Sequence, residues 1–118
     1  MVMAKPALDP AVVKRLRQLN QPGQPDLVTE VLVLFRADAP ARLAAINDAV
    51  HSGNGPALQR AAHALKGAAG TIGAHALHDL CKILEEMGKT GVWGGASAAV
   101  EETHREYLQL REEIDHLL

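Results

Sequence analysis

Apolar residues recur every three to four positions along most of this chain, which is the spacing of helices that bury one face. Short stretches rich in Gly, Pro, Asn and Ser, residues that favour turns, separate the periodic segments. The pattern predicts five helices, over residues 10–19, 26–51, 56–71, 74–87 and 96–117. Because the first is short and the other four are long, we expect an all-α fold: an antiparallel four-helix bundle with a short additional N-terminal helix.

Several residues indicate where these helices begin, bend or end. Asp9 and Pro10 suit the cap and the first turn of the first helix. Gly88 is expected to end the fourth helix. Pro40 lies within the second helix, and because proline lacks an amide proton and clashes with the preceding turn, we expect this helix to kink or break there.

Composition supports one helical domain over residues 1–118. The 118 residues have a mass of 12.6 kDa, which is near the usual size of a single domain with its own core. The chain contains 20 Ala and 16 Leu, whereas aromatic residues account for only 3%. Such a composition suits closely packed helices better than sheets.

Charge and hydropathy exclude several classes of protein. The net charge of −2, and a third helix whose only basic residues are Arg60 and Lys66, argue against a nucleic-acid-binding protein. No apolar run approaches the roughly 18 residues of a membrane span, and the N-terminus lacks the apolar stretch of a signal peptide. The single Cys excludes an intramolecular disulfide. We therefore expect a cytoplasmic protein without membrane insertion, and a monomer because no large apolar stripe is left over.

One stripe of the helix predicted over residues 56–71 combines unusual residue types. At about 100° per residue, the apolar positions of this helix cluster within about 60° of one direction, which must face the core. His63 lies about 140° from that direction, so its imidazole is expected at the surface. Three more residues share the outward side at helical spacing: Lys66, Gly67 and Gly70.

The two glycines distinguish this stripe from an ordinary solvated face. An interior glycine costs a helix about 1 kcal/mol relative to alanine, and neither Gly67 nor Gly70 points into the core, where close packing could offset that cost. Glycine beside an exposed histidine leaves space for another molecule to approach the imidazole. With the positive charge of Lys66 one turn away, the arrangement suits a nitrogen nucleophile that accepts and holds a phosphoryl group.

The same residues carry a resemblance to a known family. The run His-x-Leu-Lys-Gly at His63 to Gly67, with the later Gly73 and with Leu-Cys and Leu-Glu on the next helix, resembles a histidine-containing phosphotransfer (HPt) domain of bacterial phosphorelays. The resemblance extends over nearly the whole chain, through Leu-Asp-Pro at residues 8–10 and Leu-Phe-x-x-x-Ala-Pro at residues 34–40. One departure is Ala-Ala-Gly at residues 68–70, where many relatives have Ser or Ala throughout.

The resemblance implies a function and a role for each site residue. His63 would accept a phosphoryl group from the aspartate of one receiver domain and pass it to another. Lys66 would pair with the phosphoryl oxygens or with an acidic pocket of the partner, and Gly67 would leave room for the partner's active site. Gln59, one turn before His63, could hydrogen-bond the phosphohistidine, while the extra Gly70 could loosen the end of the helix.

The resemblance also implies what the domain lacks. It would have no kinase activity and no cofactor of its own, since the receiver would supply Mg²⁺. Its partners would be receiver domains of response regulators or of a hybrid sensor histidine kinase, and the chain could stand alone or form the cytoplasmic C-terminal module of such a membrane-bound kinase. Partners would dock on the exposed flank of the third helix and the adjoining part of the second.

Other interpretations of the pattern remain open. His75, His78 and Cys81 are spaced by three and could suggest a metal site, but Cys81 falls on the apolar stripe of its helix and no second helix supplies an obvious ligand, so we expect no metal. A bundle that only binds partners is the second alternative, and the presence of His63 argues against it. We expect Glu85 and Glu86 to lie on a solvent-exposed face of their helix.

Overall fold

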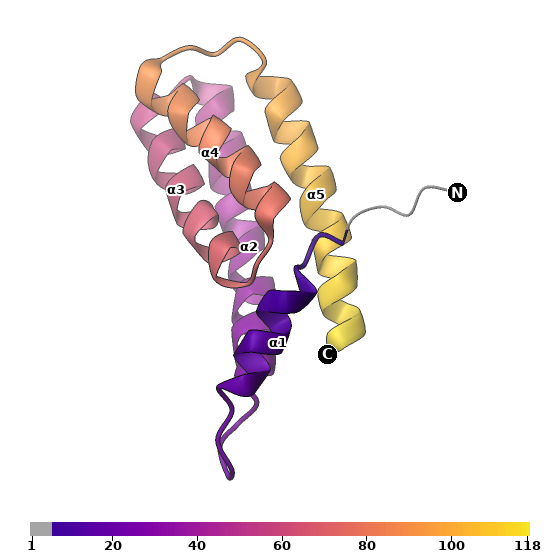
Figure 1. The fold of residues 1–118 in the computed structure, drawn as a ribbon. Coiled ribbons are helices and arrows are strands. Elements are labelled where there is room, and N and C mark those ends of the chain that lie inside the picture. Colours follow the sequence, from indigo (N-terminus) through magenta and orange to yellow (C-terminus); the bar gives the residue numbers. More distant parts are fainter. Residues whose placement is uncertain (1–5) are drawn as a thin grey trace, which may run out of the picture.

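The computed structural model describes residues 6–118, so residues 1–5, which we assign from the sequence to the same domain, lie outside the described residues. Within this range the chain forms five helices and no strand (Figure 1). They are α1 (Pro10–Gln18), α2 (Leu27–Ser52), α3 (Gly55–Thr71), α4 (His75–Thr90) and α5 (Ala96–Leu117). The prediction of an all-α bundle of four long helices with a short N-terminal helix is confirmed.

The long helices form an antiparallel bundle in which α3 and α4 make the most extensive contact (Figure 1). Helix α2 packs beside α3, α5 packs beside α4, and α1 packs against α2. None of the helices within residues 6–118 is both long enough and apolar enough to cross a bilayer.

The core is built from the apolar stripes that the sequence shows. Aliphatic side chains from the four long helices fill it, and small alanines allow α3 to approach its neighbours closely. The most deeply buried side chains include Leu32, Ile46, Leu58, Ala62, Leu65, Ala69, Leu77, Leu84, Leu110 and Ile114. This packing fixes the rotation of α3 about its axis, and thereby the direction of its outward face.

Helix α2 runs through Pro40 as one helix of 26 residues, so of the two outcomes that we expected at this residue, a kink or a break, the structure excludes the break. Pro40 is exposed, whereas Ala39 and Leu43 beside it are buried. The carbonyl that loses its helical partner to proline thus lies on the side of the helix that water can reach. Burial of the opposite face holds the helix together across the missing hydrogen bond.

Helix α4 continues past Gly88, so the prediction that this residue ends the helix is wrong. The helix ends at Thr90, and Gly91 caps it with a φ of 74°, a left-handed conformation that favours glycine. Gly88 is buried, and a Cβ atom there would lie 2.6 Å from the Gly55 carbonyl oxygen and 2.7 Å from the Gln59 amide nitrogen. Gly88 therefore allows α3 and α4 to touch backbone to backbone.

The connection between α4 and α5 closes the same end of the bundle (Figure 1). Trp93 in this connection is half-buried and packs against the core, as expected of an anchor in a glycine-rich loop. Its Cζ2 atom lies 3.9 Å from the point where a Cβ of Gly55 would be. The only indole of the chain thus lies at the junction of α3 with α4.

Hydrogen bonds hold α1 against the other end of the bundle, where α3 turns into α4. Asp9 caps α1 by accepting a 2.9 Å hydrogen bond from the Ala11 amide, and its own amide donates to the Gly73 carbonyl at 3.1 Å. The second Asp9 oxygen lies 2.9 Å from Nε2 of His75. These contacts tie the N-terminal helix to the turn between α3 and α4.

Candidate functional site

His63 lies on the outward side of α3, as its place in the helical pattern predicts. The neighbouring Ala62 and Leu65 are fully buried, whereas the His63 side chain is 70% exposed. Its Nδ1 atom lies 3.1 Å from Oε1 of Glu85 on α4. Among the described residues, no hydrogen bond to the other ring nitrogen, Nε2, is present. One nitrogen is therefore held and the other is open to solvent.

Glu85 binds both His63 and Lys66 from the facing helix. Its second oxygen, Oε2, lies 2.6 Å from Nζ of Lys66, and its side chain is only 18% exposed. The hydrogen bond from Lys66, followed by that from His63, holds the pKa of the Glu85 carboxyl below its ordinary value, although burial acts in the opposite direction. At neutral pH this group is a carboxylate.

The charge of Glu85 decides which nitrogen of His63 carries the proton. An ionised carboxylate only accepts hydrogen bonds, so Nδ1 must donate and carry the hydrogen. In the neutral ring the lone pair is then on Nε2, the exposed nitrogen. Nε2 can therefore act as a nucleophile, and no further base is needed to remove a proton from it.

Lys66 belongs to this site, but its ammonium group contacts Glu85. The Lys66 side chain is 23% exposed, and its Nζ atom lies against Glu85 on α4. We expected it to meet the phosphoryl oxygens or an acidic pocket of a partner. In the structure it neutralises the carboxylate that holds His63.

The surface beside His63 is open because of the two glycines. A Cβ atom on Gly67 would have no other atom within 4 Å, apart from its own helix backbone and chain neighbours. A Cβ atom on Gly70 would meet only Cδ2 of His78 at 3.5 Å, an ordinary contact. Packing within the described residues therefore requires neither glycine.

Gln59 lies one turn before His63 on the same helix. Its backbone touches Gly88, and its side chain is half-buried. Within residues 6–118, no hydrogen bond from its amide to the imidazole is present. The structure thus places Gln59 beside the site and leaves its expected bond to a phosphorylated His63 as a prediction.

Glu85 is the residue of this site that we interpreted wrongly from the sequence, as part of a solvated face. Glu86 is exposed, but Glu85 directly follows the buried Leu84 and comes four residues after the buried Cys81. That spacing places Glu85 at the edge of the buried stripe, where α3 packs. From this spacing the sequence could have predicted that Glu85 is partly buried while Glu86 is exposed.

The histidines of α4 are engaged away from Cys81. His75 contacts Asp9, and Nδ1 of His78 lies 3.2 Å from Asp79. Cys81 is buried, and burial raises the pKa of its thiol to about 12, with Glu85 adding to the effect. Within the described part of the chain, no three His, Cys, Asp or Glu side chains are grouped so that they could hold a metal ion.

An apolar groove lies on the other side of α3, against α2. Its volume is about 180 Å³, and aliphatic and aromatic side chains make up most of its lining. The lining residues are Val31, Leu34, Phe35, Asp38, Ala39, Arg42, Leu65, Ala68, Thr71 and Ile72. Leu34 is 62% exposed, so this face offers apolar surface to a partner.

Comparison with known proteins bears on the family and the fold of the chain. The family model described as the Hpt domain matches residues 30–118. A crystal structure of histidine-containing phosphotransfer protein B (HptB) from Pseudomonas aeruginosa PAO1 is similar to this chain, with a TM-score of 0.86 and 30% sequence identity over 96% of this chain and 95% of that one. No curated protein sequence matches the chain.

Proposed function

This chain belongs to the Hpt family, whose members carry phosphoryl groups in phosphorelays and are not kinases, and we propose that His63 is its phosphoacceptor. The observation that carries this assignment is the exposed imidazole whose Nδ1 is held by Glu85 while Nε2 remains open. His63 would take the phosphoryl group from the aspartate of one receiver domain and transfer it to the aspartate of another.

The transfer needs little from this chain beyond a positioned nitrogen. The Nε2 lone pair forms the bond to phosphorus as the bond from phosphorus to the aspartyl oxygen breaks, and that electron pair leaves with the carboxylate. The ring, now substituted on both nitrogens, carries positive charge. The Glu85 carboxylate, 3.1 Å from Nδ1, balances that charge without removing the proton. In the reverse direction, the lone pair returns to Nε2.

The remaining chemistry belongs to the partner. The transition state of phosphoryl transfer is loose, with charge spread over the phosphoryl oxygens, so catalysis depends on positioning and charge neutralisation. We propose that the receiver supplies Mg²⁺ for this purpose and that the domain itself binds no cofactor. The open surface over Gly67 gives the receiver's active site room to reach Nε2.

We propose that receivers dock over α3 and the adjoining face of α2. The apolar groove that includes Leu34 and Ala68 adjoins this flank, and the Asp38 and Arg42 side chains in its lining offer polar contacts. The partners are receiver domains of response regulators or of a hybrid sensor histidine kinase, in the cytoplasm. The chain could act there by itself or as the C-terminal module of such a kinase.

Phosphotransfer from a receiver tests the proposal. A receiver domain phosphorylated with labelled phosphate is mixed with the chain and Mg²⁺, beside the variants His63→Gln and His78→Gln. We expect acid-labile, alkali-stable label on the wild type and on His78→Gln, and none on His63→Gln. Label that persists in His63→Gln would assign the reaction to another histidine. Failure of a panel of receivers to label the folded wild type would favour a bundle that only binds partners.

A further inference from the structure

The end of the bundle that carries α1 is less completely closed than the other end. Helices α3 and α4 meet at a turn, where the Gly73 carbonyl accepts a 3.1 Å hydrogen bond from the Asp9 amide. Beyond that turn α1 packs against α2, and the 2.8 Å ion pair of Arg36 with Asp115 joins α2 to α5 (Figure 1). Among the described residues, α1 and α5 do not pack against each other. The place of a fourth helix at this end, between α1 and α5, is therefore open.

A groove with a volume of about 420 Å³ lies between these two helices, and we call it the α1–α5 groove. One wall is a face of α1, formed at helical spacing by residues 10, 13, 14 and 17, and the other wall is formed by residues 113, 116 and 117 of α5. Most of its surface is apolar, and Leu117 on one wall is 41% exposed, while Pro10 on the other is also exposed. A groove between two helices suits the apolar face of a third helix.

The rim of the α1–α5 groove is basic. Helix α1 contains three basic residues and no acidic residue, although the whole chain has a net charge of −2. Two of the three, Lys14 and Arg17, belong to the lining of the groove and are exposed. No ion pair among residues 6–118 includes either of them. The charge of the rim therefore favours a ligand with carboxylates.

Glu113 is the one carboxylate among the lining residues, and hydrogen bonds within the chain occupy both of its oxygens. Oε2 accepts from the Ala7 amide at 2.8 Å and from Nε2 of Gln109 at 3.2 Å, and Oε1 accepts from the Leu8 amide at 3.0 Å. These donors stabilise the negative charge of Glu113 and reduce its repulsion of an acidic ligand. They also hold the segment before α1 against α5, which fixes one wall of the groove relative to the other.

We propose that the α1–α5 groove binds an acidic amphipathic helix of a partner protein. The apolar face of that helix would lie on Leu117 and Pro10, and its carboxylates would meet Lys14 and Arg17. None of the lining residues belongs to α3 or α4, so a partner in the groove leaves the surface around His63 uncovered. The chain can thus be held at one place while another protein reaches His63, and the binding does not depend on the role proposed for that histidine.

Twin synthetic peptides test the charge preference of the groove. Each is an amphipathic helix with a leucine face, which glutamate flanks in one peptide and lysine in its twin. Fluorescence anisotropy of the labelled peptides measures affinity, and amide NMR shifts locate the binding. We expect the glutamate peptide to shift the amides of α1 and the last turns of α5, and the lysine twin to bind there about tenfold more weakly. Lys14→Glu combined with Arg17→Glu should reverse this preference, whereas the control, Lys82→Glu combined with Arg105→Glu, should not.

A pair of leucine substitutions tests the apolar contact. Leu117 and Leu108 are both exposed on α5, at 41% and 50%, but only Leu117 lines the α1–α5 groove. We expect Leu117→Asn to weaken binding of the glutamate peptide about tenfold, because apolar area is no longer buried against it. Leu108→Asn should bind the peptide like the wild type.

Several results would overturn the proposal. They are binding of neither peptide, equal binding of both at the groove, and shifts centred on another face. Phosphatidylglycerol vesicles that bind the wild type but not the Lys14 and Arg17 variant, with no peptide bound, would assign the basic rim to a membrane instead. A dimer that Leu117→Asn dissociates would assign the groove to a second copy of the chain. Failure of a receiver to label His63, with the glutamate peptide bound as expected, would overturn the proposed function alone.

Discussion

Gly67 and Gly88 are both glycines inside helices, yet their surroundings are opposite. Nothing lies within 4 Å of a Cβ atom on Gly67, whereas a Cβ atom on Gly88 would collide with the backbone of α3. The outward position of Gly67 follows from helical spacing, and the sequence was sufficient to predict it. The contact at Gly88 depends on the register between two helices, which no spacing within one helix specifies.

Replacing Gly67 by alanine should separate folding from function. We expect Gly67→Ala to raise the free energy of unfolding by up to about 1 kcal/mol, because alanine favours the helix and has free space here. We expect transfer from a receiver to slow by about tenfold or more, because the added methyl group crowds the docked partner. Urea unfolding and label-transfer kinetics measure the two effects. Transfer at the wild-type rate would show that a receiver does not need this space.

Glu85 should make the stability of the protein depend on pH. Its pKa in the folded chain lies below its ordinary value of 4.5, so its stabilising effect is complete above that pH and is lost as the pH falls through the lowered value. The difference in unfolding free energy between the wild type and Glu85→Gln should therefore be largest at neutral pH and shrink below about pH 4.5.

The control for this measurement is the exposed neighbour Glu86. Unfolding in urea at a series of pH values compares Glu85→Gln with Glu86→Gln, which changes the same charge one residue away. Glu86→Gln should follow the wild type throughout. A pH-independent difference for Glu85→Gln would show that the carboxylate does not gain stability from Lys66 and His63.

At the scale of single elements, helix boundaries are where the sequence and the structure differ. Pro40 does not break α2 because the missing hydrogen bond lies on the exposed side and the buried side stays packed. Gly88 does not end α4 because its small size serves the contact with α3, and Gly91 provides the left-handed cap instead. Both residues were judged by local conformational preference, which tertiary packing overrides here.

The contact between α3 and α4 makes Gly88 more sensitive to substitution than Gly67. Gly88→Ala should lower the free energy of unfolding by about 2 kcal/mol or more, because the new methyl group meets backbone atoms that can move only with their helices. Thermal unfolding followed by circular dichroism measures this, with Gly67→Ala as the matched control. If the two substitutions had the same effect, the close approach of α3 and α4 would not be a determinant of stability.

At the scale of the whole molecule, the bundle itself could be predicted. Five periodic segments with apolar stripes and few aromatic residues leave few alternatives to packed helices, and the stripe positions also placed His63 at the surface. The partners of His63 could not be predicted in the same way. Glu85 is 22 residues away on another helix, and only the packed bundle brings its carboxylate to Nδ1.

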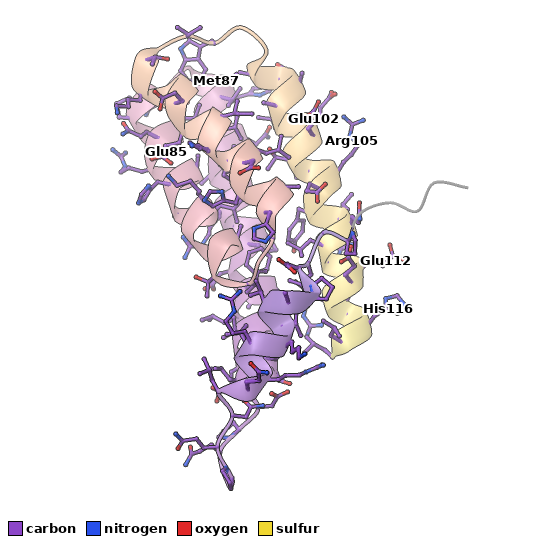
Figure 2. The ribbon with its side chains drawn as sticks, viewed as in Figure 1. Glu85, Met87, Glu102, Arg105, Glu112 and His116 are labelled. Carbon is purple, nitrogen blue, oxygen red and sulfur yellow. The ribbon has the colours of Figure 1, made fainter. Side chains whose placement is uncertain are left out.

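The expectation of a monomer concerns the outer surface of the bundle. On α5, Glu102, Arg105, Glu112 and His116 point away from the other helices (Figure 2). Charged side chains of this kind are depleted from the centre of stable interfaces. Light scattering after size-exclusion chromatography should give a mass near 12.6 kDa across a wide range of concentrations. A mass near twice this value would show that another face, such as the groove between α2 and α3, associates with itself.

The fluorescence of Trp93 can report on events near the site. The chain has one tryptophan, and it packs where Gly55 and Gly88 join the helices that carry His63 and Glu85. Indole emission responds to small changes in its surroundings. Rapid-mixing fluorescence could therefore time the arrival of a phosphoryl group, or of a receiver, on the unmodified chain without any attached dye.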